Sequence, residues 1–174
     1  MSNGEKVENP KYLKKSIEKL KKLQKQQSRK TKGGRNWIKN RIKIARLHEK
    51  IANQRMDFIN KLSTRIITEY DIICIEDLKV DNMLKKHNLV QSISDVSWSK
   101  FTTQLEYKAE WYGKVIKKVD TFYASSQTCH CCGYKNEETK NLTVREWTCP
   151  KCHSNHDRDV NASINILMQG ILEN

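Results

Sequence analysis

The longest hydrophobic pattern in this chain has helical spacing. Apolar residues recur every three or four positions from about 36 to 69, which predicts a long amphipathic helix. A shorter stripe precedes it, made of Leu13, Ile17, Leu20 and Leu23. Asn9 and Pro10 stand before that stripe and suit the N-cap and first position of a helix. With a glycine pair at 33–34 between the helices, we expect an antiparallel arm over about 10–69, basic outside and apolar between.

At residue 71 the period becomes that of a strand. Residues 71–78 are a short, nearly continuous apolar run that ends in Glu76 and Asp77, the pattern of a strand buried on both faces. A polar connection over 80–97 follows. Its Lys85, Lys86 and His87 could touch a phosphate.

Three more elements are predicted downstream. A helix over 98–112 is stopped by Gly113, and a Val- and Ile-rich strand over 114–123 comes next. The last helix runs from 160 to about 172. Its expected buried stripe is Val160, Ile164, Leu167 and Ile171. Helices and strands together predict an α/β fold.

Charge is concentrated in the predicted arm. Between Lys11 and Lys50 there are sixteen Lys or Arg and two Glu, a net of +14 in a chain whose total is +13. A polyanion is the natural partner, because neutralising phosphates releases counterions. The alternative is a solvated, self-repelling helix face. The candidate nucleic-acid contacts are Lys21, Lys22, Lys25, Arg29, Lys30, Arg35, Lys39 and Arg41.

Four cysteines have the spacing of a zinc ribbon. Two C-x2-C pairs are separated by sixteen residues, and they comprise Cys129, Cys132, Cys149 and Cys152. Because all four ligands are cysteines, the zinc has no open position and is structural. Cys131 could compete with Cys132 as a ligand, although C-x2-C is the commoner geometry. Cys74 is expected to be a small core residue.

The beginning of the chain carries a turn signal. Asn3-Gly4 is a strong hairpin turn, with only Met1 and Ser2 before it and a possible strand through Lys6 and Val7 after it. This suggests that the natural polypeptide has an upstream strand, and the alternative is a disordered terminus. Neither a signal peptide nor an apolar run near 18 residues is present, so we expect a cytoplasmic, nucleoid-associated protein without membrane contact.

Two carboxylates stand at positions where active sites form. Glu76 ends the first predicted strand, and sites in open α/β sheets lie at the carboxyl ends of strands. Asp159 directly precedes the last helix. Taken alone, Glu76 could be an exposed turn carboxylate and Asp159 a plain N-cap.

The motifs together resemble a known family. Tyr123-Ala-Ser-Ser-Gln-Thr-Cys129, Trp147-Thr-Cys-Pro-Lys-Cys152 and His156-Asp-Arg-Asp-Val-Asn-Ala162 are similar to the carboxyl-terminal part of the TnpB (OrfB) proteins of bacterial insertion sequences. These proteins are RNA-guided DNA endonucleases related to the compact type V CRISPR effectors. The resemblance covers about residues 3–170.

The resemblance implies a RuvC-like, RNase H-type nuclease domain interrupted by the ribbon. Residues 1–124 would be its first part, 125–156 the ribbon and 157–174 the closing helix. Three acids of the family hold two Mg²⁺ ions, and the second and third match Glu76 and Asp159. The first lies in a Gly-Ile-Asp-like stretch on a strand that this sequence lacks, and Glu5 and Glu8 do not match it. Asp77 and Asp157 are weaker candidates with a supporting or surface role.

Three hypotheses follow. The chain is a carboxyl-terminal fragment of an RNA-guided DNA endonuclease, inactive alone, with DNA, guide RNA and the missing amino-terminal part as partners. Alternatively it is a non-enzymatic DNA- or RNA-binding zinc-ribbon protein, or the product of a decayed transposon gene. Whether the chain is itself an enzyme stays open at this point.

Overall fold

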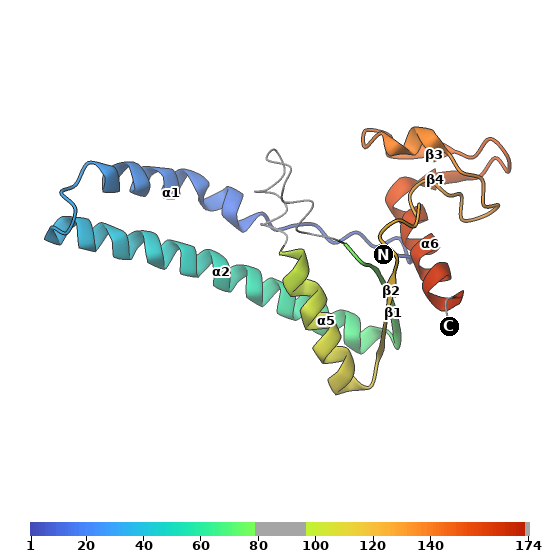
Figure 1. The fold of residues 1–174 in the computed structure, drawn as a ribbon, viewed down its shortest axis with the longest axis horizontal. Helices are drawn as coiled ribbons and strands as arrows, with labels where there is room; N and C mark the ends of the chain where they lie inside the picture. The colour runs from blue at the N-terminus through green and yellow to red at the C-terminus, as the bar shows by residue number, and fades with distance from the viewer. Residues whose placement is uncertain (79–96, 173–174) are drawn as a thin grey trace. The chain divides into compact units, whose positions relative to one another are not determined.

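The computed structural model describes residues 1–78 and 97–172. The elements are α1 (Tyr12–Ser28), α2 (Arg35–Glu69), β1 (Ile72–Glu76), α5 (Trp98–Tyr112), β2 (Val115–Val119), the 3-10 helix η1 (Glu137–Lys140), β3 (Glu146–Thr148), β4 (Asn155–Asp157) and α6 (Arg158–Leu172), as Figure 1 shows. The predicted α/β character and the order of the predicted elements are therefore confirmed. The connection that carries Lys85, Lys86 and His87 lies outside the described residues.

The described residues form two compact units. One contains 9–66 and 97–108, and the other contains 1–8, 67–78 and 109–172. None of the helices within the described ranges is long and apolar enough to cross a membrane.

The predicted antiparallel arm is present in the first unit, where α1 and α2 lie side by side (Figure 1). Its buried centre is Leu20, Leu47 and Ile51, surrounded by Tyr12, Leu13, Leu23 and Ile44. Ile38 and Ile42 belong to the predicted stripe, yet their side chains are 47% and 46% exposed. At 100° per residue they lie on roughly the opposite side of α2 from Ile44, Leu47 and Ile51, which pack against α1.

The first helix begins later than predicted. Lys11 precedes α1 in the left-handed region, with a φ of 55°, and makes no side-chain cap. The Asn9 carboxamide oxygen accepts a hydrogen bond from the Lys11 backbone N–H at 2.9 Å. Asn9 therefore forms a local turn that competes with helix, and the prediction that it caps a helix starting at Pro10 is wrong.

A buried lysine joins α2 to α5 within the same unit. Lys108 is 5% exposed, and its Nζ donates to Asn60 O, Asn60 Oδ1, Ser63 Oγ and Thr64 Oγ1 at 2.7 to 2.9 Å. Burial lowers the pKa of Lys108. Three ammonium protons shared among four oxygens offset the desolvation of the charge.

The second unit contains a parallel strand pair. β1 pairs with β2 so that Ile72 lies opposite Val115 and Glu76 opposite Val119. α6 packs against both strands. Burial on both faces of β1 is not observed at Ile72, which is 48% exposed. The predicted strand over 114–123 is shortened because the chain turns after β2, where the Tyr123 N–H donates to Asp120 O.

A turn is present at the start of the chain, but its central residues are Ser2 and Asn3 and not the predicted Asn3 and Gly4. The Gly4 N–H donates to Met1 O at 3.0 Å, and Gly4 has a φ of 86°, which glycine adopts without a steric penalty. Lys6 and Val7, however, belong to no strand.

The most buried side chains of α6 are polar, and the predicted apolar stripe is confirmed only in part, because Val160, Ile164 and Leu167 are half-buried. Ile171 is 50% exposed, whereas Asn161 and Asn165 are 1% and 3% exposed. The Asn165 Nδ2 donates to Ser125 O and Thr128 O at 2.8 and 2.6 Å, and the Asn161 Nδ2 donates to Thr128 O at 2.7 Å. These amides face the carbonyl groups of the segment that leads into the cysteine ribbon, and a hydrocarbon side chain could not satisfy them.

Candidate metal centres and nucleic-acid surface

The four predicted cysteine ligands converge on one point. The sulfur atoms of Cys129, Cys132, Cys149 and Cys152 all lie within 4.8 Å of one another. The Cys129–Cys152 and Cys132–Cys149 sulfur pairs are both 3.6 Å apart. Zinc–thiolate bonds of about 2.3 Å in a tetrahedron require sulfur atoms about 3.8 Å apart, so this cluster fits one structural zinc ion.

Two tight turns aim these sulfur atoms. Gly133, with a φ of 73°, donates its N–H to Cys129 O, and His153, with a φ of 59°, donates its N–H to Cys149 O. Trp147 is 8% exposed and packs against Cys129 and Cys149. The antiparallel pair β3–β4 holds the second turn in place.

The thiols differ in their readiness to ionise. Burial raises the pKa of Cys129 to about 12, while hydrogen bonds from Ser154 lower the pKa of Cys152 to about 6. A thiol must lose its proton to bind zinc. Metal binding by this cluster therefore competes with protons, chiefly at Cys129.

Glu76 ends β1 on the side of the sheet that α6 covers. Cys74, two residues earlier on the same face of the strand, contacts Gly170 of α6. The Glu76 side chain is half-buried, and this burial raises its pKa. A partly desolvated carboxylate gains free energy from a nearby cation.

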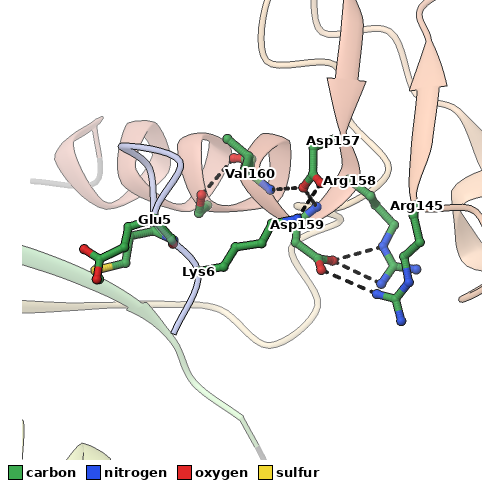
Figure 2. A network of polar contacts seen from close by, with 9 residues as sticks. Glu5, Lys6, Arg145, Asp157, Arg158, Asp159 and Val160 are labelled. Carbon is green, nitrogen blue, oxygen red and sulfur yellow. Dashed lines mark hydrogen bonds and ion pairs between the residues drawn. The ribbon is translucent and has the colours of Figure 1, made fainter. Parts of the chain in front are cut away.

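Asp159 lies in the first turn of α6 between two arginines, as Figure 2 shows. Its Oδ1 accepts from Nε and NH2 of Arg158 at 3.3 and 3.1 Å, and its Oδ2 accepts from NH1 of Arg145 at 3.4 Å. The side chain is 54% exposed. The Asp159 carboxylate is therefore accessible to solvent, and the two arginines define its orientation.

The helix cap next to Asp159 is Asp157. Its Oδ1 accepts from the N–H groups of Asp159 and Val160, both at 3.0 Å. Lys6 Nζ lies 2.6 Å from the other oxygen of Asp157 and lowers the pKa of that carboxyl (Figure 2). The alternative that Asp159 is a plain N-cap is wrong, because Asp157 fills that role and the Asp159 carboxylate pairs with Arg145 and Arg158 instead.

Glu76 and Asp159 belong to the same unit and to elements that pack together. Within the described ranges, the groups that bring three or more possible metal ligands within 4.8 Å all contain Cys129, and neither acid belongs to one. The packing of α6 on β1 therefore brings together the helix that carries Asp159 and the strand that carries Glu76. A shared site for the two carboxylates is supported by this packing and not by a close contact between the carboxylates themselves.

The basic arm presents most of its predicted contacts to solvent. Seven of the eight candidate residues are exposed, and Lys30 is half-buried. A hollow of about 190 Å³ lies between α1 and α2 and is lined by Tyr12, Lys15, Ser16, Lys19, Leu47, Lys50 and Gln54. Lys15, Lys19 and Lys50 of this hollow were not among the contacts predicted from the sequence. The register of the two helices decides which basic side chains come together, and the sequence alone does not give that register.

The described fold is a mixed α/β structure with a cluster of four cysteines that could hold a metal ion. The family described as probable transposase, OrfB_IS605, matches residues 1–87, and the Cas12f1-like TNB domain matches 98–166. The chain belongs to the OrfB_IS605 family.

Relatives and solved structures agree with this assignment. A candidate RNA-guided DNA endonuclease of Streptomyces pristinaespiralis is 45% identical over 171 residues, which are 98% of this chain and 42% of the relative. InsQ of Escherichia coli K12, named in the same way, is 37% identical over 185 residues, 98% of this chain and 46% of that protein. The chain thus spans less than half the length of these relatives.

Among solved structures, a CRISPR-Cas12f ternary complex matches with a TM-score of 0.63 and 25% identity, over 89% of this chain and 32% of that one. A Cas12f1 complex with sgRNA and target DNA matches with a TM-score of 0.57 and 22% identity, over 88% of this chain and 42% of that one. At 22% identity, the similarity to the Cas12f1 complex is a similarity of fold alone.

Proposed function

We propose that this chain forms part of an RNA-guided DNA endonuclease and supplies two carboxylates of a nuclease centre with a RuvC-like, RNase H-type fold. One observation carries the proposal: Glu76 ends β1, Asp159 lies in the first turn of α6, and α6 packs on β1. The names of the relatives give the reaction class. Guide RNA and target DNA are the proposed partners.

Glu76 and Asp159 would hold Mg²⁺, for which hard carboxylate oxygens are suited. When bound, a pair of such cations supplies an activated water and stabilises the leaving oxygen in phosphodiester hydrolysis. Arg158, 8% exposed, and the more exposed Arg145 hold the Asp159 carboxylate in one orientation. The cysteine ribbon would bind zinc and keep the start of α6 in place through Asn161 and Asn165.

Complementation tests this proposal. The family resemblance assigns a third carboxylate to a strand for which this sequence has no matching motif, so we expect no cleavage by the chain alone in Mg²⁺. Adding the portion of the Streptomyces relative that this chain does not match, with its guide RNA, should restore target cleavage. Glu76→Gln and Asp159→Asn should then each reduce the rate by at least about 100-fold, equivalent to a loss of roughly 2.7 kcal/mol of transition-state stabilisation. A complemented Glu76→Gln protein that cleaves as well as wild type would defeat the proposal.

A second function, binding of DNA or RNA without cleavage, is favoured by the basic arm and its lysine-lined hollow. The relative named CRISPR-associated DNA-binding protein Cas12m, from Pelobacter propionicus, is 30% identical over 139 residues, 74% of this chain and 20% of that protein. Association with the nucleoid would follow from such binding. Filter binding across a salt series tests it, because a complex held by phosphate contacts weakens steeply as salt rises. An affinity independent of salt would contradict it.

A further inference from the structure

A second group of metal-binding side chains adjoins the tetracysteine cluster. The ligand atoms of Cys129, Cys131 and His156 all lie within 4.8 Å of one another. His156 is 5% exposed, and its Nε2 is 3.1 Å from the Cys129 sulfur. Cys131 is exposed. This group shares only Cys129 with the zinc-ribbon set.

His130 adds a further nitrogen, and its ring is oriented by hydrogen bonds. The Asn161 Nδ2 donates to Thr128 O at 2.7 Å, so the Asn161 Oδ1 is an acceptor. That oxygen lies 3.1 Å from the His130 backbone nitrogen and 2.9 Å from His130 Nδ1. In the neutral tautomer that fits these contacts, Nδ1 carries the proton and Nε2 presents a lone pair 3.4 Å from the Cys131 sulfur.

This arrangement is the usual one for a metal-binding histidine. A hydrogen bond from one ring nitrogen to an oxygen acceptor fixes the tautomer and aims the other nitrogen at the metal. Asn161 does this for His130 while it also fastens α6 to the ribbon. His130 is thus oriented toward the exposed thiol of Cys131.

Formal charge favours a second cation at this place. Four thiolates around one Zn²⁺ leave the ribbon centre with a charge of −2. A second Zn²⁺ that shares the Cys129 thiolate and adds the Cys131 thiolate leaves the pair of ions with −1. The added cation therefore reduces an excess of negative charge in a partly buried place, provided that Cys129 bridges the two ions.

We propose that Cys129, Cys131 and His156, with His130 as the nearest further nitrogen, form a second site for a thiophilic divalent cation such as Zn²⁺. Mixed sulfur and imidazole ligands suit Zn²⁺ and its spectroscopic substitute Co²⁺. The site goes beyond the proposed nuclease function and does not depend on it. The competing arrangement is a single-ion ribbon in which His156 donates a hydrogen bond to the Cys129 thiolate.

Cobalt titration of the full chain distinguishes one ion from two. Thiolate-to-cobalt charge-transfer absorption reports only cysteine-bound Co²⁺, so cobalt held by Glu76 or Asp159 does not contribute. We expect this absorption to grow until two equivalents of Co²⁺ are bound. Cys131→Ser should lose one equivalent and keep the first, and Cys74→Ala, which removes a cysteine outside the cluster, should keep both.

Alkylation of Cys131 gives an independent measurement. With one equivalent of Zn²⁺ the exposed Cys131 thiol should react rapidly with iodoacetamide, and with two equivalents its reaction should slow by at least tenfold. Saturation of the wild-type absorption at one equivalent would overturn the proposal. A second equivalent that survives Cys131→Ser, or an alkylation rate that the second equivalent of Zn²⁺ leaves unchanged, would overturn it as well.

Discussion

Gly170 of α6 lies directly against Cys74 of β1. A Cβ atom at position 170 would be 2.6 Å from the Cys74 sulfur and 3.0 Å from its Cβ, whereas ordinary contact begins at 3.4 Å. The helix can approach the strand this closely only because position 170 has no side chain. The contact fixes the helix that carries Asp159 onto the strand that carries Glu76.

Gly170→Ala should therefore destabilise the protein. Overpacking costs about 1–3 kcal/mol, and the higher helix propensity of alanine returns at most about 1 kcal/mol. Urea unfolding should show a net loss of about 1–2 kcal/mol. The double variant Gly170→Ala/Cys74→Ala, which removes the facing sulfur, should lose less than the sum of the single changes. Equal stability of Gly170→Ala and wild type would show that the helix does not approach the strand so closely.

Asn165→Ala should loosen the ribbon. The substitution removes the Nδ2 donor from Ser125 O, while Thr128 O keeps its hydrogen bond from Asn161 Nδ2, and an unsatisfied buried polar group costs about 1–3 kcal/mol. We expect a loss of about 2 kcal/mol in urea unfolding and faster transfer of zinc to a chelator. Ser163→Ala is the matched control, because the Ser163 hydroxyl donates to Val160 O within its own helix. A control variant as unstable as Asn165→Ala would contradict this role.

The sequence predicted the positions of the helices and strands better than it predicted which of their side chains are buried. The end of α5 and the convergence of the four cysteines followed from local patterns, because a glycine stop and C-x2-C spacing act over a few residues. The burial of Asn161 and Asn165 could not be predicted in this way, because a periodicity analysis counts apolar residues. These two amides are buried because they donate hydrogen bonds to carbonyl groups more than thirty positions away in the sequence. The competition between Asp157 and Asp159 for the helix cap was likewise decided by three-dimensional geometry.

Among the ionisable pairs, Asp71 and Lys114 give a prediction with a definite sign. The Lys114 Nζ lies 2.5 Å from the Asp71 Oδ1, and this hydrogen bond lowers the pKa of Asp71 below 3.8. Because the pKa is lower in the folded protein, the stabilisation is present above pH 3.8 and is lost as the pH falls through the folded-state pKa. Carboxyl NMR titration should show the pKa of Asp71 rising toward 3.8 in Lys114→Met. Lys14→Met, which removes an exposed charge in the other unit, should leave it lowered.

The lysine-lined hollow of the arm should contribute to nucleic-acid binding. Lys15 and Lys50 line it from α1 and α2, and each phosphate contact adds about 0.9 to the slope of log affinity against log salt for duplex DNA. Lys15→Gln/Lys50→Gln should therefore reduce that slope by about two in filter binding. The control Lys100→Gln/Lys151→Gln removes the same charge from exposed positions outside the arm. A control that lowers the slope equally would deny the hollow a specific role.

The most direct test of the shared carboxylate site is Mn²⁺ titration followed by NMR of the full chain. A bound paramagnetic ion broadens the resonances of residues around it, so the amides of Glu76 and Asp159 should broaden together at the same Mn²⁺ concentration. Asp159→Asn should remove the broadening at Glu76, while Asp57→Asn, in the other unit, should leave it. If Glu76 broadens just as strongly in Asp159→Asn, or never broadens in the wild-type chain, the two acids do not share a metal site.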